Sequence, residues 1–146
     1  MRWVFFLIAV CLCACFDRGD CTDYSSNKLH VGFYNNSSKK TQKIKMDSVL
    51  MEGLDSVMYK NPTDSLSSVI LPLNYAQDVA RFHFYYQSNH SILDLKYTRK
   101  TFVLAVDCNA IDLLTLDDAT AITIKDLKIS VPDITKNAIE NIKLYF

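Results

Sequence analysis

Glycine, proline and tryptophan are scarce in this chain: its 146 residues include three glycines, three prolines and one tryptophan. Glycine-rich loops that hold phosphate groups need several glycines at fixed spacing, and neither a P-loop nor a G-x-G-x-x-G turn is present. No serine lies in a G-x-S-x-G motif, which is typical of α/β-hydrolases. These absences exclude the best-known nucleotide-binding motifs and a common hydrolase motif.

An excess of charge of one sign is also missing, since Lys and Arg number 16 and Asp and Glu number 16. A protein that binds nucleic acid ordinarily carries a basic patch and a positive net charge. Apolar residues make up 49% of the chain and charged residues 22%, which is typical of a folded domain rather than a disordered segment. We therefore predict one globular domain with no nucleic-acid partner.

The N-terminal apolar run is too short to be a membrane span. It covers Trp3–Ala14 and follows Met1 and Arg2. At about 1.5 Å per residue, such a helix cannot cross a hydrocarbon core of roughly 30 Å. A short positive start followed by an apolar segment is typical of a signal peptide, which we place at residues 1–14. The alternative is an N-terminal helix or strand that is buried in the domain.

Residues 12–15, Leu-Cys-Ala-Cys, resemble a bacterial lipobox, in which a branched apolar residue and two small residues precede the cysteine. In that pathway the peptide is cut before Cys15 and the Cys15 thiol is acylated. Two or three acyl chains hold a protein to a membrane far more firmly than one. The alternative is cleavage after Cys15, which would give a secreted protein. We predict a lipidated Cys15 and a short tether over residues 15–27.

The remaining cysteines predict one disulfide. If Cys11 and Cys13 leave with the signal peptide and Cys15 is acylated, then Cys21 and Cys108 remain as thiols. Two cysteines in an exported domain indicate a pair, and the long loop between them would contribute roughly 4–5 kcal/mol in the chain-entropy model. The alternative is two independent thiols. A metal site is disfavoured, because no CxxC spacing occurs and no histidine lies near either cysteine in the sequence.

From Lys28 onward, segments of alternating apolar and polar residues are separated by turn-forming residues. The clearest segment is Ala80–Gln87, in which Phe82 and Phe84 lie on one face and His83 and Tyr85 on the other. About ten residues separate successive segments. This pattern predicts an all-β fold, an immunoglobulin-like β-sandwich of about seven to eight short antiparallel strands over residues 28–146.

Three segments carry more specific expectations. The strand that ends near Pro72 is predicted at a sheet edge, because proline cannot donate to a ladder. Thr101–Cys108 is predicted as a strand with Cys108 on its core side, and Asn109–Ala119 as a short helix. Asp133–Asn141 is expected to hold a helical turn.

Histidines and aspartates are the natural candidates for catalysis or metal binding. His30 and His83 lie on the polar faces of predicted strands and His90 in a turn, so solvated surface side chains are the simplest interpretation. Whether two of them meet in space does not follow from the sequence. An acidic run could supply oxygens to Ca²⁺ but lacks the spacing and the glycine of an EF-hand, and turn and capping roles are the simpler explanation: Asp107, Asp112, Asp117 and Asp118. No metal, cofactor or catalytic residue is assigned.

Tyrosines offer a possible ligand surface. Tyr85 and Tyr86, with Tyr75 and Tyr97, could form an aromatic platform for a sugar or a peptide. Strand alternation places Tyr85 and Tyr86 on opposite faces, so at least one of the two is expected in the core.

Several short motifs together suggest a family. They are Val31-Gly32-Phe33, Leu71-Pro72-Leu73, Phe82-His83-Phe84, Leu93–Tyr97 and Asn141–Phe146, with Cys15, Cys21 and Cys108. This set resembles a family of small Bacteroidota lipoproteins of the domain-of-unknown-function 6452 type. The resemblance implies a β-sandwich on a lipid anchor and brings no known reaction.

Our leading hypothesis is a non-enzymatic lipoprotein that is anchored in the bacterial outer membrane and faces either the periplasm or the cell surface. It would act as a binding or assembly module. The short tether favours a membrane-embedded partner, such as an outer-membrane β-barrel protein. The alternative is a glycan- or peptide-binding module that uses exposed tyrosines. An enzyme is the third hypothesis, and it requires His83 or His90 beside carboxylates in a cleft.

Overall fold

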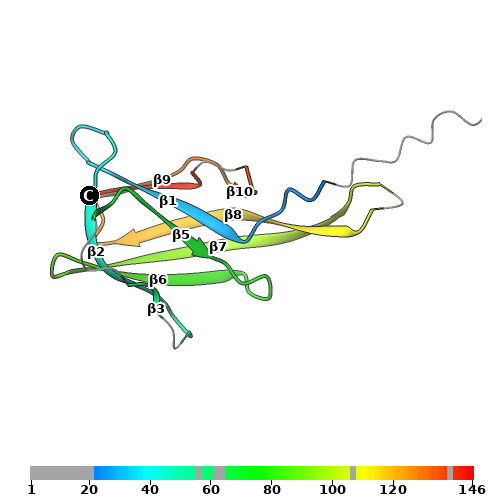
Figure 1. Ribbon diagram of the computed structural model, residues 1–146, viewed down its shortest axis with the longest axis horizontal. Helices are drawn as coiled ribbons and strands as arrows, with labels where there is room; N and C mark the ends of the chain where they lie inside the picture. Colours follow the sequence, from blue (N-terminus) through cyan, green and yellow to red (C-terminus); the bar gives the residue numbers. More distant parts are fainter. Residues whose placement is uncertain (1–21, 55–56, 61–64, 106–107, 138–139) are drawn as a thin grey trace, which may run out of the picture.

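The computed structural model describes residues 22–54, 57–60, 65–105, 108–137 and 140–146. Within these ranges the chain is all-β, without a helix, and its strands form two sheets (Figure 1). The strands are β1 (Lys28–Tyr34), β2 (Ile44–Met51), β3 (Val57–Lys60), β4 (Ser65–Leu66), β5 (Ser68–Pro72), β6 (Val79–Tyr86), β7 (Asn89–Val103), β8 (Ala110–Ile122), β9 (Asp126–Ile129), β10 (Asp133–Ile134) and β11 (Ile142–Tyr145). None of the described residues forms a helix with the length and apolarity of a membrane span.

The smaller sheet has the strand order β5-β1-β11-β9. β1 pairs with β5 in the antiparallel sense and with β11 in the parallel sense, with Val31 opposite Ile142. β5, which ends at Pro72, is an edge strand as predicted. Strands from the two ends of the domain therefore lie side by side at the centre of this sheet.

The larger sheet has the order β10-β8-β7-β6-β2-β3, and β4 also pairs with β2. Its centre is a meander in which β6, β7 and β8 follow one another in sequence and in space. β7 and β8 are the longest strands, with 15 and 13 residues. Their paired far ends extend beyond the other strands of both sheets (Figure 1).

The core lies between the two sheets and is built from alternate residues of each strand. From β1, Leu29, Val31 and Phe33 are fully buried, and β6 contributes Phe82 and Phe84 from the opposite sheet. The rings of Phe33 and Phe84 meet edge to face, with centroids 6.4 Å apart. This period-2 burial is the reason that the alternating sequence pattern identifies these strands.

The segment that precedes β1 runs along the molecule toward the far end of β7 and β8 (blue in Figure 1). Ser25 forms an isolated bridge with Thr135, and the Lys136 backbone N–H donates to the Tyr24 carbonyl at 3.0 Å. Lys136 Nζ donates to the Asp23 carbonyl at 2.8 Å and lies 3.3 Å from the Asp23 carboxylate. Thr22 and Asp23 therefore lie at the end of the molecule where the β7–β8 hairpin projects.

The prediction of an all-β sandwich is confirmed, but the number and length of the strands are not. The described residues form eleven strands rather than seven or eight, two of them are long, and the β1–β11 pair is parallel. Three short strands, β3, β4 and β10, were missed because segments of two to four residues show too few alternations to be recognised.

The helix predicted at Asn109–Ala119 is wrong, because Ala110 onward belongs to β8. The pairing with β7 shifts between Lys96 and Tyr97, so Asp117 is an extra residue in β8. Before this bulge Leu114 and Leu116 face the core, and after it Ala119 and Ala121 are packed against it. The residues of β8 that face the core therefore have even numbers before the bulge and odd numbers after it. This break in the alternation gives the apolar residues a spacing that resembles that of a helix.

One smaller expectation also fails. Thr101–Cys108 is not a separate core strand, because Thr101–Val103 ends β7 and Phe102 and Val103 are 39% and 62% exposed. Within Asp133–Asn141, Asp133 and Ile134 form β10 and Lys136 and Asn137 form a turn, and residues 138–139 lie outside the described ranges, so the helical turn expected there stays a prediction.

Candidate functional site

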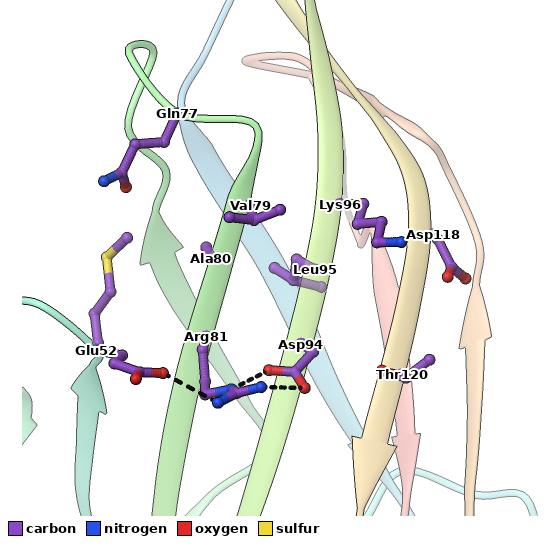
Figure 2. A pocket seen from close by; sticks show the side chains of 11 residues that line it. Glu52, Gln77, Val79, Ala80, Arg81, Asp94, Leu95, Lys96, Asp118 and Thr120 are labelled. Carbon is purple, nitrogen blue, oxygen red and sulfur yellow. Dashed lines mark hydrogen bonds and ion pairs between the residues drawn. The ribbon is translucent and has the colours of Figure 1, made fainter.

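The outer face of the larger sheet, which points away from the smaller sheet, carries a hollow of about 520 Å³ (Figure 2). Its floor is made by outward-facing side chains of β6, β7 and β8, and Glu52 closes it beside the end of β2. Charged groups of both signs line it: Glu52, Arg81, Asp94, Lys96 and Asp118. The hollow is a shallow surface that is open to solvent and not an enclosed cleft.

Arg81 is the central side chain of this hollow. Its Nε lies 2.5 Å from Asp94 Oδ1 and its Nη2 lies 3.1 Å from Asp94 Oδ2, so the guanidinium binds the carboxylate through two hydrogen bonds. Glu52 Oε2 lies 3.4 Å from Arg81 Nη1 on the other side (Figure 2). The hydrogen bond to Asp94, and then the charges of Asp94 and Glu52, raise the pKa of Arg81. These contacts hold an array of charge across β6, β7 and the turn after β2.

A cluster of three rings follows along the same face, formed by His83, Tyr85 and His90. Tyr85 lies directly opposite His90 in the β6–β7 ladder, and their rings stack with centroids 4.6 Å apart and planes 15° apart. His83 Nδ1 lies 3.1 Å from His90 Nε2, and these two rings are parallel to within 6°. One nitrogen must donate to the other, and the tautomers decide which one does.

The local sequence explains this arrangement. Residues 81, 83 and 85 alternate onto one face of β6, and residues 90 and 94 alternate onto the same face of β7. The turn at Gln87 and Ser88 has positive φ values of 47° and 65°, as in a type I′ hairpin turn. Counting outward from this turn pairs Tyr85 with His90 and Arg81 with Asp94.

A second hollow of about 560 Å³ adjoins the first and shares Met51, Glu52 and Gln77 with it. Tyr75 lies in its wall, and burial raises the pKa of the Tyr75 hydroxyl. Gly53, at φ +82°, forms the turn after β2 on its other side.

The tyrosines expected as a platform are separated, as the alternation predicts. Tyr85 is 36% exposed on the outer face. Tyr86 is half-buried on the opposite face, where its ring meets Phe146 edge to face and its hydroxyl lies 2.9 Å from Ser91 Oγ. Tyr97 is buried, and its hydroxyl donates to the Asn74 carbonyl at 3.1 Å. Only Tyr85 of these three therefore presents a ring to a ligand.

The cysteines are placed in part. Cys15 and Cys21 lie outside the described residues, so the lipidation and the disulfide stay predictions. Cys108 is half-buried in a bend at the far end of the β7–β8 hairpin, and its backbone N–H donates to the Ala105 carbonyl at 3.0 Å.

The acidic run does not form a cation site in the part of the chain that the structure describes. Asp112 accepts a hydrogen bond from Thr101, Asp117 accepts one from Thr98, and Asp118 accepts one from the Ala119 backbone. Asp107 lies outside the described residues. In the ranges given above, no group of three or more His, Cys, Asp or Glu side chains could hold a metal ion.

Sequence reasoning missed the Glu52–Arg81–Asp94 array and the meeting of His83 with His90. The position of the turn between β6 and β7 could have revealed the Arg81–Asp94 and His83–His90 contacts. A two-residue turn at Gln87-Ser88 fixes every cross-strand pair of these strands. Gln-Ser is not one of the dipeptides that mark such turns, so the register did not follow from the sequence.

No curated protein and no solved structure matches this chain. A family model described as "Family of unknown function (DUF6452)" matches residues 33–146. This range contains every strand from β2 to β11 and the end of β1, so the match covers most of the sandwich. The chain therefore belongs to the DUF6452 family, as its motifs suggested.

Proposed function

We propose that the protein is a non-enzymatic, lipid-anchored binding or assembly module of a bacterial outer membrane. The lipobox-like residues 12–15 support the anchor at Cys15. The observation that carries the membrane-proximal role is the position of Thr22 and Asp23 at the end where the β7–β8 hairpin projects (Figure 1). An anchor a few residues upstream holds that end of the domain nearest the bilayer.

The anchor is tested by membrane fractionation of cells that express the full chain with Cys15→Ala. Loss of acylation removes the buried CH₂ groups, each of which contributes about 0.8 kcal/mol, so the variant should move to the soluble fraction. Cys108→Ala is the matched control, because it changes a cysteine without removing the anchor. A Cys15→Ala variant that stays with the membranes would show that the anchor is assigned wrongly.

A partner embedded in the same membrane, such as an outer-membrane β-barrel protein, fits this orientation. Val103 is 62% exposed at the hairpin end, and Ile122 is 54% exposed at the other end of the same hairpin. A photo-crosslinking residue at position 103 of the full chain should capture a β-barrel protein, and one at position 122 should not. Equal capture from both positions, or from neither, would contradict the proposed orientation.

The Cys21–Cys108 disulfide belongs to the same proposal. Cys108 lies at the hairpin end, and the described segment before β1 (blue in Figure 1) reaches toward the same end of the molecule. Such a bond would fasten the tether to the hairpin. Alkylation followed by intact-mass analysis should leave both cysteines unmodified until a reductant is added, and two alkylated cysteines without reductant would exclude the bond.

A second candidate function, glycan binding on the outer face, is favoured by the Tyr85 ring and the neighbouring polar hollow. An exposed aromatic face beside fixed hydrogen-bonding groups is the arrangement that binds sugar rings. Tyr85→Ala should then abolish retention on a glycan array. Tyr24→Ala is the matched control, because Tyr24 is also 36% exposed but lies on the segment before β1. Equal behaviour of the two variants would remove this candidate.

A further inference from the structure

We propose that His83 and His90 form a binding site for a divalent transition-metal ion such as Zn²⁺, Ni²⁺ or Cu²⁺. The two histidines belong to neighbouring strands and are diagonal neighbours on the outer face, since His83 lies opposite Ile92 and His90 lies opposite Tyr85. Diagonal cross-strand positions bring long side chains within contact distance. Neutral imidazole nitrogens are the ligands that these ions commonly take.

The distance between the facing nitrogens suits two ligands of one ion. His83 Nδ1 and His90 Nε2 are 3.1 Å apart. With metal–nitrogen bonds of about 2.0–2.1 Å, this separation corresponds to an angle of about 98° at the metal. That angle lies between the values of octahedral and tetrahedral coordination. To point at the ion, each lone pair must turn by about 40° from the line that joins the two nitrogens, within the plane that the nearly parallel rings share.

A metal ion can replace the hydrogen bond between His83 and His90 without the loss of a proton from the two neutral imidazoles. In the metal-free pair, one facing nitrogen carries N–H and the other carries a lone pair. The donating ring offers a second lone pair when its hydrogen moves to its other ring nitrogen, and no proton is lost from the neutral pair. A protonated imidazole would have to release its proton before it could bind the ion.

The surroundings of the pair also favour an ion. The Tyr85 ring packs on the face of His90 and so restricts the tilting of the imidazole out of its plane. This contact holds the edge of His90 that carries Nε2 toward His83. Arg81, the next residue on the same face of β6, is held by Asp94 and Glu52. No third protein ligand is found among the described residues, and water or a donor from another molecule would complete the coordination.

The site is tested with zinc alone added to the ¹⁵N-labelled full chain. The chain has three histidines, so its imidazole signals are few. We expect the signals of His83 and His90 to move together and saturate while those of His30, on β1, stay unchanged. Mg²⁺, which prefers oxygen ligands, should move none of them. Equal shifts of all three imidazoles, or no shift with zinc in large excess, would overturn the proposal.

Single substitutions separate this site from the glycan surface. His83→Ala or His90→Ala should weaken zinc binding by about 100-fold, because the second imidazole no longer acts at high effective concentration. His30→Ala and Tyr85→Phe should leave it within a factor of about three. His83 is half-buried and His90 is exposed, so both variants should fold. If His83→Ala leaves the response of His90 unchanged, the two residues do not share an ion.

Discussion

The two halves of β7 show what a second sheet adds to a strand. From Ser91 to Tyr97, alternate residues are buried under the smaller sheet, and Leu93, Leu95 and Tyr97 are at most 2% exposed. From Thr98 to Val103 every residue is exposed, although this half is paired with β8 just as regularly. Pairing alone therefore forms the strand, and the covering sheet decides which of its side chains stabilise the fold.

The bulge at Asp117 marks the boundary between the two halves. It lies opposite the step from Lys96 to Tyr97, and Thr98 Oγ1 donates to Asp117 Oδ1 at 3.3 Å. Bulges increase the local twist of a strand pair. Here the bulge lies where β7 and β8 leave the sandwich, so the projecting half can turn away from the covering sheet.

The largest expected effect comes from equivalent truncations in the two halves. Leu93→Ala should lower the free energy of unfolding by about 2–5 kcal/mol, because it leaves a cavity among fully buried side chains. Val103→Ala, in the projecting half, should change it by less than about 0.5 kcal/mol. Urea unfolding of the full chain measures both values, and equal losses would show that the halves do not differ in their contribution to stability.

A smaller loss of stability is expected from a change at Asn141. This side chain holds the segment before β10, which lies next to the boundary between the two halves of β7. Asn141 is fully buried, accepts from the His30 backbone at 3.0 Å, and donates to the Val131 and Asp133 carbonyls at 3.0 and 3.1 Å. β10, which begins at Asp133, pairs with β8 opposite the start of the projecting half.

Asn141→Ala leaves these backbone groups without partners, at a cost of about 2–3 kcal/mol in the free energy of unfolding. Asn89→Ala is the matched control, because the exposed Asn89 amide donates only to the Gln87 carbonyl in the neighbouring turn. Thermal unfolding should separate the two variants clearly. A similar melting temperature for both variants would mean that the hydrogen bonds of Asn141 do not stabilise the fold.

The smallest effect is a pH dependence that arises from the last buried residue of the covered half. Burial raises the pKa of the Tyr97 hydroxyl, although its hydrogen bond to Asn74 opposes the shift. As the pH rises, the Tyr97 hydroxyl ionises in the unfolded chain before it does so in the folded protein. Its contribution to the free energy of unfolding is therefore fully present below pH about 10 and is lost as the pH rises through the pKa of Tyr97 in the folded protein.

Tyr97→Phe should cost about 1 kcal/mol at neutral pH, since it removes one hydrogen bond. It should also flatten the fall in stability above pH 10. The free energy of unfolding at a series of alkaline pH values measures both changes. Identical slopes for the wild type and the variant would assign the alkaline fall to other groups, such as Tyr75.

The sequence predicted the elements that obey simple alternation and missed those that depend on register. β1, β6 and the covered half of β7 alternate without interruption, so their core faces were correctly predicted. Asn109–Ala119, which contains the first part of β8, shows a helix-like pattern because the bulge breaks the alternation. The candidate site was missed for a related reason: the Gln87-Ser88 turn, which brings His83 to His90 and Arg81 to Asp94, adopts positive φ values without glycine or asparagine.

The parallel pairing of β1 with β11 has a consequence for the order of folding. His30 and Asn141 are 111 positions apart in the chain, whereas β6, β7 and β8 are joined by nearby turns. Closing the longer loop costs more entropy before any contact is gained, so the meander should form first and the smaller sheet last. A partly folded chain would then expose the apolar inner face of the meander, and this intermediate is the species most prone to aggregation. Pulse-labelling hydrogen exchange should accordingly show protection of Ile142 and Leu144 after that of Phe82 and Leu93.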